Sequence, residues 1–271
     1  MEVGNWVDLP RDVLILIFAK LGAFDILFSA QMVCSSWWEL SKDPQFFRCI
    51  DMCDNTLWRY WGSTKEWVIQ RIAMQAVDRS CGGLVEFSIR YFGTNQLLHY
   101  IAISYGLAEV ARKNVLLEEV DLCFTSHPEE AIIVIGCACP QLKSIRLDCR
   151  GFDLPNYSPI NKLEWNLLPF FIPRSMPQLR RLHLFRNKLS DVGLREILDG
   201  CPALEYLDLR QCFNIVDSHL LRTCEQRIHK LRLVHDSLED NEFDPQYFFY
   251  PPYYEECSPS HLSDKENLAF Q

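Results

Sequence analysis

The residue types best suited to chemistry in this sequence are twelve cysteines and seven histidines. Thiolates and imidazoles can hold zinc, and a cysteine beside a histidine can act as a nucleophile with its base. Cys137 and Cys139 are separated by one residue instead of the roughly two to four of common zinc motifs, and no second pair accompanies them. The histidines are scattered, and none stands near a cysteine at a spacing typical of a nucleophile family.

Recognised catalytic motifs are also missing from the sequence. No G-x-S-x-G, H-E-x-x-H, G-x-x-x-x-G-K-[ST] or G-x-G-x-x-G occurs. A Cys–His nucleophile brought together by folding stays open as an alternative. We therefore expect a non-catalytic protein with no cofactor and no metal.

The cysteines favour a role in packing. The chain has 271 residues, of which 48 % are hydrophobic and 23 % charged, as in an ordinary globular protein. Cys81, Cys139 and Cys201 recur at one position of a repeat, and free cysteine packs as a small hydrophobic residue. Reduced thiols then indicate a location in the nucleus and/or cytoplasm.

Charge and hydropathy argue against two classes of partner. A formal charge of -9 gives no basic surface for nucleic acid. The most apolar stretch, residues 13–30, is interrupted by Lys20, Gly22 and Asp25 and is too short in its uncharged runs to span a membrane. We expect neither nucleic acid nor membrane as a partner.

A pattern of the form L-x-x-L-x-L recurs six times, with first positions 24 to 37 residues apart and an underlying period of about 25. Its copies are Leu84-Phe87-Ile89, Leu117-Val120-Leu122, Leu142-Ile145-Leu147, Leu179-Leu182-Leu184, Leu204-Leu207-Leu209 and Ile228-Leu231-Leu233. Alternation of inward leucines predicts short parallel strands, and segments such as residues 190–202 predict helices behind them. No coil can bury its own apolar face, so stability must come from stacking.

The amino-terminal segment carries more apolar surface than its own helices can bury. Pro10 suits the first turn of a helix, and Val13, Leu14, Ile17 and Phe18 continue at helical spacing. Leu16 and several residues beyond Gly22 widen the apolar stripe. Excess of this kind indicates a protein partner.

These motifs carry a family resemblance. Leu-Pro at residues 9–10, the helical run, Val-Cys-Ser-Ser-Trp at 33–37 and Asp-Pro at 43–44 resemble an F-box, and the repeats resemble cysteine-containing leucine-rich repeats of plant F-box proteins. The resemblance implies an α/β fold: a helical F-box followed by an open curved leucine-rich-repeat solenoid with a parallel sheet on the concave face. Residues matching F-box core or Skp-adaptor contact positions are Leu9, Pro10, Leu14, Ile17, Leu21, Val33, Cys34 and Trp37.

The resemblance also implies a function as substrate-recognition adaptor of a Skp–cullin–F-box ubiquitin ligase. The F-box would bind the Skp adaptor and, through it, cullin, while the repeats would hold a protein substrate. Alternatives are a Skp-bound scaffold acting outside a ligase and an unrecognised enzyme. Candidate substrate-contacting residues, taken from outward strand positions and an inserted loop, are Arg146, Trp165, His183, Phe185 and Arg210. The outward positions are mixed in sign, which suits a protein surface or peptide.

Four segments are expected along the chain: an F-box at 1–50, a Trp-rich helical linker at 51–80, leucine-rich repeats at 81–235 and a disordered acidic, aromatic tail at 236–271. Two helix-like pieces without a strand motif lie between Leu84 and Leu117, where this family would have a further coil. A strand-bearing segment is expected to have been lost there.

Overall fold

A computed structural model describes residues 9–53, 66–90, 92–110, 116–123, 128–148 and 168–238 of the chain. The chain divides into two units, Met1–Asp236 and Ser237–Gln271. Trp165 lies outside the described residues, and so does the predicted tail (236–271) from residue 239 onward.

Short helices form the amino-terminal part of the first unit. They are α1 (Arg11–Phe18), α2 (Ala23–Phe28), the 3-10 turn η2 (Ala30–Met32), α3 (Ser35–Leu40) and the 3-10 turn η3 (Pro44–Phe47). Phe18 lies at their centre, with its ring centroid 5.4 Å from that of Trp37 and 5.5 Å from that of Phe46. Asp43 starts η3, because its carboxylate accepts a hydrogen bond of 3.1 Å from the backbone N–H of Gln45.

Seven parallel strands follow in chain order and pair with their sequence neighbours in an open sheet. The strands are β1 (Cys49–Met52), β2 (Glu86–Arg90), β3 (Glu119–Cys123), β4 (Ser144–Asp148), β5 (Arg181–Phe185), β6 (Tyr206–Asp208) and β7 (Lys230–Arg232). All six strands expected from the leucine pattern are confirmed as β2 to β7. The inward residues of β2 to β6, such as Phe87 and Leu182, are buried, while Leu231 and Leu233 of the last copy are half-buried. β1 was missed because its copy of the pattern reads Phe47-Ile50-Met52, without a single leucine.

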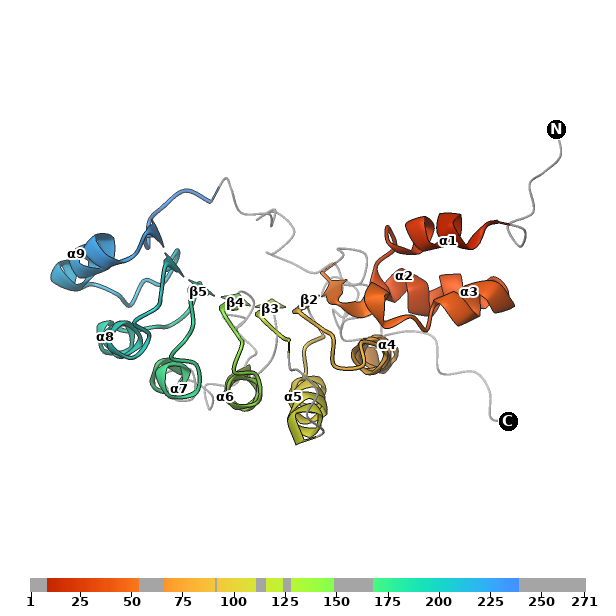
Figure 1. Ribbon diagram of the computed structural model, residues 1–271. Coiled ribbons are helices and arrows are strands. Elements are labelled where there is room, and N and C mark those ends of the chain that lie inside the picture. The colour runs from red at the N-terminus through yellow and green to blue at the C-terminus, as the bar shows by residue number, and fades with distance from the viewer. Residues whose placement is uncertain are drawn as a thin grey trace, which may run out of the picture. The chain divides into compact units, whose positions relative to one another are not determined.

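Among the described residues, six helices cover one side of the sheet, and no described helix covers the other side, which we call the open face (Figure 1). They are α4 (Glu66–Arg79), α5 (Asn95–Val110), α6 (Pro128–Ala138), α7 (Leu168–Ser175), α8 (Asp191–Gly200) and α9 (Ser218–Arg227). In the part of the chain that the structure describes, no helix combines the length and the apolar character needed to cross a membrane. Each helix packs on the next, so the coils bury one another as the stacking argument requires.

The long step between Leu84 and Leu117 leaves no gap in the sheet. β2 pairs directly with β3, with Glu86 opposite Glu119. α5, 16 residues long, takes up the additional chain between these strands. The extra length therefore extends a helix, and the stack of strands continues past it.

The described parts of the segment predicted as a linker, residues 51–53 and 66–80, pack as part of the solenoid. β1 pairs with β2, and α4 packs against both α2 and α5. Arg79, at the end of α4, donates hydrogen bonds to the carbonyl of Ser41 at 2.6 Å, to its hydroxyl at 2.8 Å and to the Gln31 side-chain oxygen at 2.9 Å. The first coil is thus joined to the F-box helices by a charged side chain with three partners.

The recurring cysteine position is a packing position in three of its four copies. Cys139, Met176 and Cys201 are fully buried, and burial raises the pKa of Cys201 to about 11. Cys81 departs from the prediction: it is exposed and has a φ of 50°, since it lies in the turn after α4. All ten cysteines among the described residues are free thiols.

Candidate binding surfaces of the F-box and the sheet

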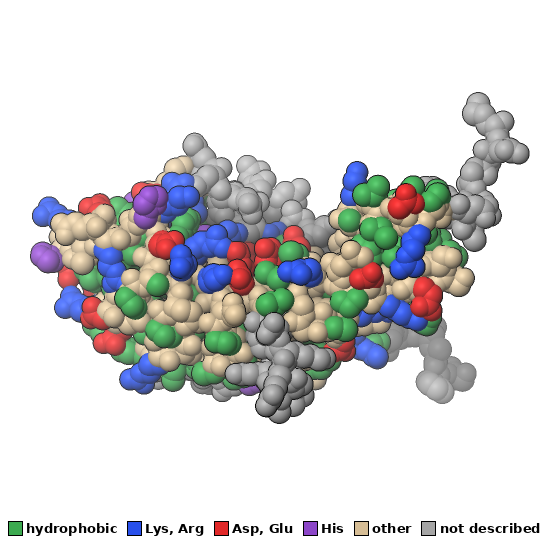
Figure 2. Space-filling view, in the orientation of Figure 1, with side chains coloured by type: hydrophobic (Ala, Val, Ile, Leu, Met, Phe, Trp, Pro, Cys, Tyr) green, Lys and Arg blue, Asp and Glu red, His purple; other side chains and the backbone are tan. Residues whose placement is uncertain are grey.

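Besides Trp38 on α3, the described F-box helices carry five exposed large apolar side chains, which we call the F-box apolar surface. They are Val13, Leu16, Phe28, Met32 and Val33, and between 37 % and 79 % of each is exposed. Figure 2 shows hydrophobic side chains gathered over α1 and the helices next to it. Burying a side chain of this size contributes roughly 1.5–3 kcal/mol when complete, so these five offer substantial energy to a partner.

The eight F-box residues predicted from the sequence differ in how far they are buried. Leu14 and Trp37 are buried in the core, and Leu9, Ile17, Leu21 and Cys34 are half-buried against it. Pro10 and Val33 are exposed. Contact of any of them with a Skp adaptor remains a prediction, but only exposed atoms can make it directly.

Four exposed residues of this surface were not among the predicted contacts: Val13, Leu16, Phe28 and Met32. Leu16 projects away from the helical stripe of Leu14 and Phe18, and that excess was the signal in the sequence. Phe28 stacks on Phe24 at 5.0 Å and so is held in place while still exposed. Met32 lies in a 3-10 turn, for which helical periodicity gives no guide.

The second candidate surface is the open face of the sheet, the side that α4–α9 leave uncovered. Strand residues reach it in three rows, because strands align residue by residue and every second side chain points to this side. The first row comprises Cys49, Glu86, Glu119, Ser144, Arg181, Tyr206 and Lys230, and the second comprises Asp51, Ser88, Asp121, Arg146, His183, Asp208 and Arg232. Ten residues of these rows, on β2 to β7, line a hollow of about 810 Å³ together with Val120, Glu205 and His229.

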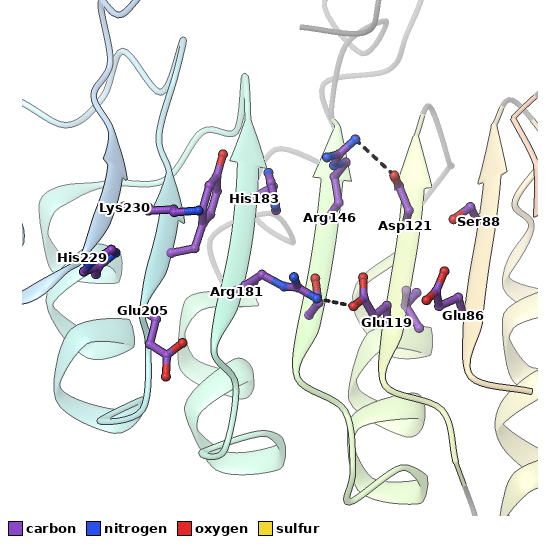
Figure 3. A pocket seen from close by; sticks show the side chains of 13 residues that line it. Glu86, Ser88, Glu119, Asp121, Arg146, Arg181, His183, Glu205, His229 and Lys230 are labelled. Atoms are coloured by element: carbon purple, nitrogen blue, oxygen red, sulfur yellow. Dashed lines mark hydrogen bonds and ion pairs between the residues drawn. The ribbon is translucent and has the colours of Figure 1, made fainter. Parts of the chain in front are cut away.

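The charges in these two rows are segregated along the sheet. β1 to β3 contribute four carboxylates and no lysine or arginine: Asp51, Glu86, Glu119 and Asp121. β4 to β7 contribute Arg146, Arg181, Lys230 and Arg232 together with His183, and their one carboxylate is Asp208. Figure 3 shows Glu86, Glu119 and Asp121 on one side of the hollow and Arg181 and Lys230 toward the other, where Glu205, just before β6 and paired with Arg180, is the one acidic side chain drawn. Charges that look mixed along the chain are therefore separated in space.

Two ion pairs bridge the boundary between the acidic and the basic half. Arg146 lies 3.4 Å from the carboxylate of Asp121 on the neighbouring strand, and Arg181 reaches past β4 to Glu119 (Figure 3). All four side chains keep between a fifth and a half of their surface exposed. These pairs fix the positions of the central charges. Glu86 on β2 and Lys230 on β7 line the two outer ends of the hollow.

The third row, near the end of each strand, is buried from β2 to β7, which corrects two assignments. Phe185 and Arg210 were expected on the outward surface, but only 5 % and 6 % of them is exposed. Arg210 binds the carboxylate of Asp208 in bidentate fashion, at 3.0 Å and 2.7 Å, and its guanidinium lies 5.8 Å from the Phe185 ring. Arg90 and Asp148, in the same row, are buried as well. Alternation gives the side of a sheet on which a residue lies and gives no information about its exposure there.

Of the predicted substrate contacts, Arg146 and His183 do reach the open face. His183 stacks on Tyr206, with ring centroids 4.4 Å apart, and its Nδ1 lies 3.8 Å from Asp208. Both residues line the hollow. Their contact with a substrate remains a prediction, and Trp165 cannot be placed beside them because it lies outside the described residues.

Two carboxylates on this face have pKa values shifted in opposite directions. Burial raises the pKa of Asp121, and the opposing effects of Arg146 and the Cys123 thiol only partly offset it. Burial alone would also raise the pKa of Asp208, but polar contacts with His183 and Arg210 outweigh it and hold that pKa well below its usual range. Asp208 therefore stays ionised at any physiological pH, as a structural partner of Arg210.

The site suits binding better than covalent chemistry. Among the described residues, no group of three or more histidine, cysteine or acidic side chains is placed to hold a metal ion. Burial raises the pKa of Cys123 and of Cys53, so these thiols near the face stay protonated. What the face offers is a hollow with charges of both signs at fixed positions.

F-box helices joined to a leucine-rich-repeat solenoid define an F-box protein of the leucine-rich-repeat class. Residues 6–53 match the family model described as F-box-like. The chain is 39 % identical to putative F-box/LRR-repeat protein 22 of Arabidopsis thaliana, over 89 % of this chain and 80 % of the relative. It is 34 % identical to F-box protein SKIP19 of the same plant, over 100 % of this chain and 97 % of that protein.

The chain therefore belongs to the F-box/LRR-repeat protein family. A third relative, putative F-box/LRR-repeat protein 23 of Arabidopsis thaliana, is 37 % identical over 87 % of this chain. That protein is longer, and the chain spans 55 % of its length.

Proposed function

We propose that this protein is a substrate-recognition adaptor of a Skp–cullin–F-box ubiquitin ligase. Its F-box binds the Skp adaptor and, through it, cullin, while its repeats hold a protein for ubiquitination. The F-box apolar surface is the observation that carries this proposal, because five exposed apolar side chains on a small helical unit need a partner to cover them. Membership of the F-box/LRR-repeat family supports the same function.

Such an adaptor needs no catalytic residue of its own. In these ligases a substrate lysine attacks a thioester carried by a separate conjugating enzyme. The adaptor binds the substrate and the ligase core at once, and so raises the effective concentration of the substrate lysine near the thioester. The Arg79 joint between F-box and first coil supports this function, since a firm connection limits the positions that the substrate can take.

A nuclear or cytoplasmic location belongs to the same proposal. Burial raises the pKa of Cys212 to about 12, and its thiol donates a hydrogen bond to the Leu184 carbonyl at 2.8 Å. Buried, unpaired thiols of this kind suit a reducing compartment. Imaging of the tagged full chain would test the location.

A pull-down from cells tests the proposed function. The bait variant is Leu16→Glu with Met32→Glu, because both side chains are exposed and their replacement leaves the F-box core intact. These positions are better suited than Leu9, which is half-buried against the core. Val192→Glu on α8 is the matched control, an equally exposed apolar residue far along the chain from the F-box.

We expect the intact chain and the Val192→Glu variant to retain the Skp adaptor and cullin. The double variant, Leu16→Glu with Met32→Glu, should lose both. Retention of the Skp adaptor by the double variant would refute the proposed contact surface. If the intact chain binds the Skp adaptor but no cullin, the result would instead favour a scaffold that acts outside a ligase.

A further inference from the structure

The open face of the sheet is electrically polarised, and the polarity restricts what can lie on it. The two surface rows carry only acidic charges on β1 to β3 and mainly basic charges on β4 to β7 (Figure 3). A ligand of one sign gains attraction over one half and suffers repulsion over the other. Nucleic acid and uniformly basic tails are therefore disfavoured by half of the face.

We propose that the open face binds an extended protein segment with a basic cluster at one end and an acidic cluster at the other. The basic cluster lies over β1 to β3, against Glu86 and Asp51, and the acidic cluster lies over β5 to β7, against Lys230 and Arg232. The inference rests on the proposed function, and it specifies the class of substrate segment that the repeats would hold. It uses the hollow of the sheet and both halves of its charge.

The geometry of the sheet sets the spacing between the two clusters. Glu86 on β2 and Lys230 on β7 are five strand steps apart in the sheet order. At about 4.8 Å per step the separation is roughly 24 Å along the sheet. An extended chain covers about 3.3 Å per residue, so the two clusters should be on the order of seven residues apart.

Two ion pairs lie at the middle of the face, between its acidic and its basic half. Arg146 with Asp121 and Arg181 with Glu119 satisfy the charges at the boundary, so the middle of a bound segment need not be charged. Tyr206 stacked with His183 offers an aromatic surface beside the boundary. The segment should thus be charged at its ends and uncharged or aromatic in between.

Two synthetic peptides of identical composition test the inference. The block peptide has two lysines, five uncharged residues including one tyrosine, and two glutamates. The alternating peptide has the same nine residues with lysines and glutamates interspersed. Both carry a fluorescent label, and anisotropy is measured with the purified full chain bound to the Skp adaptor at low salt.

We expect the block peptide to bind about tenfold more tightly than the alternating one, since only it can satisfy both halves at once. Glu86→Lys and Lys230→Glu should each weaken the block peptide about fivefold. Arg222→Glu on α9, an exposed charge reversal on the helical side, is the matched control and should leave binding unchanged. Equal affinity for the two peptides, absence of binding by both, or an equal loss in the control would overturn the inference.

Skp adaptor binding, measured on the same variants, separates this inference from the proposed function. Glu86→Lys and Lys230→Glu should bind the Skp adaptor like the intact chain. If they do, and the chain binds the block peptide no more tightly than the alternating one, the proposed polarised segment is wrong and the adaptor function stands. If the intact chain does not bind the Skp adaptor at all, the proposed function itself fails, whatever the peptides show.

Discussion

The F-box apolar surface and the open face of the sheet differ in how the chain builds them. The first consists of side chains left over when three short helices have filled a small core around Phe18. The second consists of charges that come from seven separate strands and meet only because the coils stack in register. An apolar surface can serve one partner shared by many proteins, whereas a pattern of charges distinguishes one partner from another.

The difference also shows in energetics. Apolar burial supplies affinity roughly in proportion to area, and salt affects it little. Exposed charges contribute little to stability and are screened by salt, but they orient and select a ligand. Changes to the two regions should therefore have separable effects, and four variants test this from the largest expected effect to the smallest.

Phe18→Ala should give the largest effect, on the stability of the F-box. The ring is fully buried against Trp37 and Phe46, and loss of a buried phenylalanine costs about 3–5 kcal/mol. The matched change Leu16→Ala, at an exposed position, should cost less than about 1 kcal/mol. Urea denaturation of both variants checks the division into core and surface, and equal costs would show that the division is wrong.

Asp208→Ala should destabilise the solenoid by about 3 kcal/mol, because it leaves the buried guanidinium of Arg210 without its carboxylate. The pKa of Asp208 is lowered in the folded protein, so its contribution is present above the unfolded pKa of about 4 and is lost as pH falls through the lowered folded value. The cost of Asp208→Ala should thus be unchanged between pH 7 and pH 5. A cost that already disappears at pH 5 would contradict this assignment.

Arg79→Met should weaken the joint between F-box and first coil by about 2 kcal/mol, since three hydrogen bonds to Ser41 and Gln31 are lost. We expect the single unfolding transition to broaden or split, because the two regions become less coupled. Arg180→Met is the control: its ion pair with Glu205 is exposed and should contribute under about 1 kcal/mol. Calorimetry of the two variants makes the comparison.

Asp121→Asn should have the smallest effect, and with the opposite sign. Burial raises the pKa of Asp121, so its ionised form is disfavoured by folding. Stability from such a group is present below the unfolded pKa and is lost as pH rises through the raised folded value. The variant should be equal to or up to about 1 kcal/mol more stable than the intact chain at pH 7, and equal to it near pH 3. A loss at pH 7 would mean that the pair with Arg146 outweighs burial.

The sequence predicted the repeating elements well because leucine spacing reports burial directly. Six strands and their inward residues follow from it, and the F-box helices follow from Pro10 and the apolar run after it. β1 was missed because phenylalanine, isoleucine and methionine satisfy the same packing without the leucine signature. Packing requires apolar volume at these positions, and a pattern written in leucines describes only part of that requirement.

The candidate sites were less predictable than the fold. Phe185 and Arg210 point to the expected side of the sheet, yet their mutual contact and the pairing with Asp208 bury them. The separation of acidic from basic charges depends on strand register, which sets Arg146 beside Asp121 and lets Arg181 reach Glu119. Apart from the Asp208–Arg210 pair, these contacts join residues 25 or more positions apart, so local sequence patterns do not contain them.

The central claim is that the two surfaces bind different partners independently. Titration of purified Skp adaptor into four forms of the full chain tests it most directly: intact, Leu16→Glu with Met32→Glu, Val192→Glu, and Glu86→Lys with Lys230→Glu. We expect the first variant to bind at least about 100-fold more weakly than the intact chain, since two exposed contacts of hot-spot size are lost, and the other two to bind like the intact chain. Undiminished binding by Leu16→Glu with Met32→Glu, or a comparable loss in Glu86→Lys with Lys230→Glu, would contradict the claim.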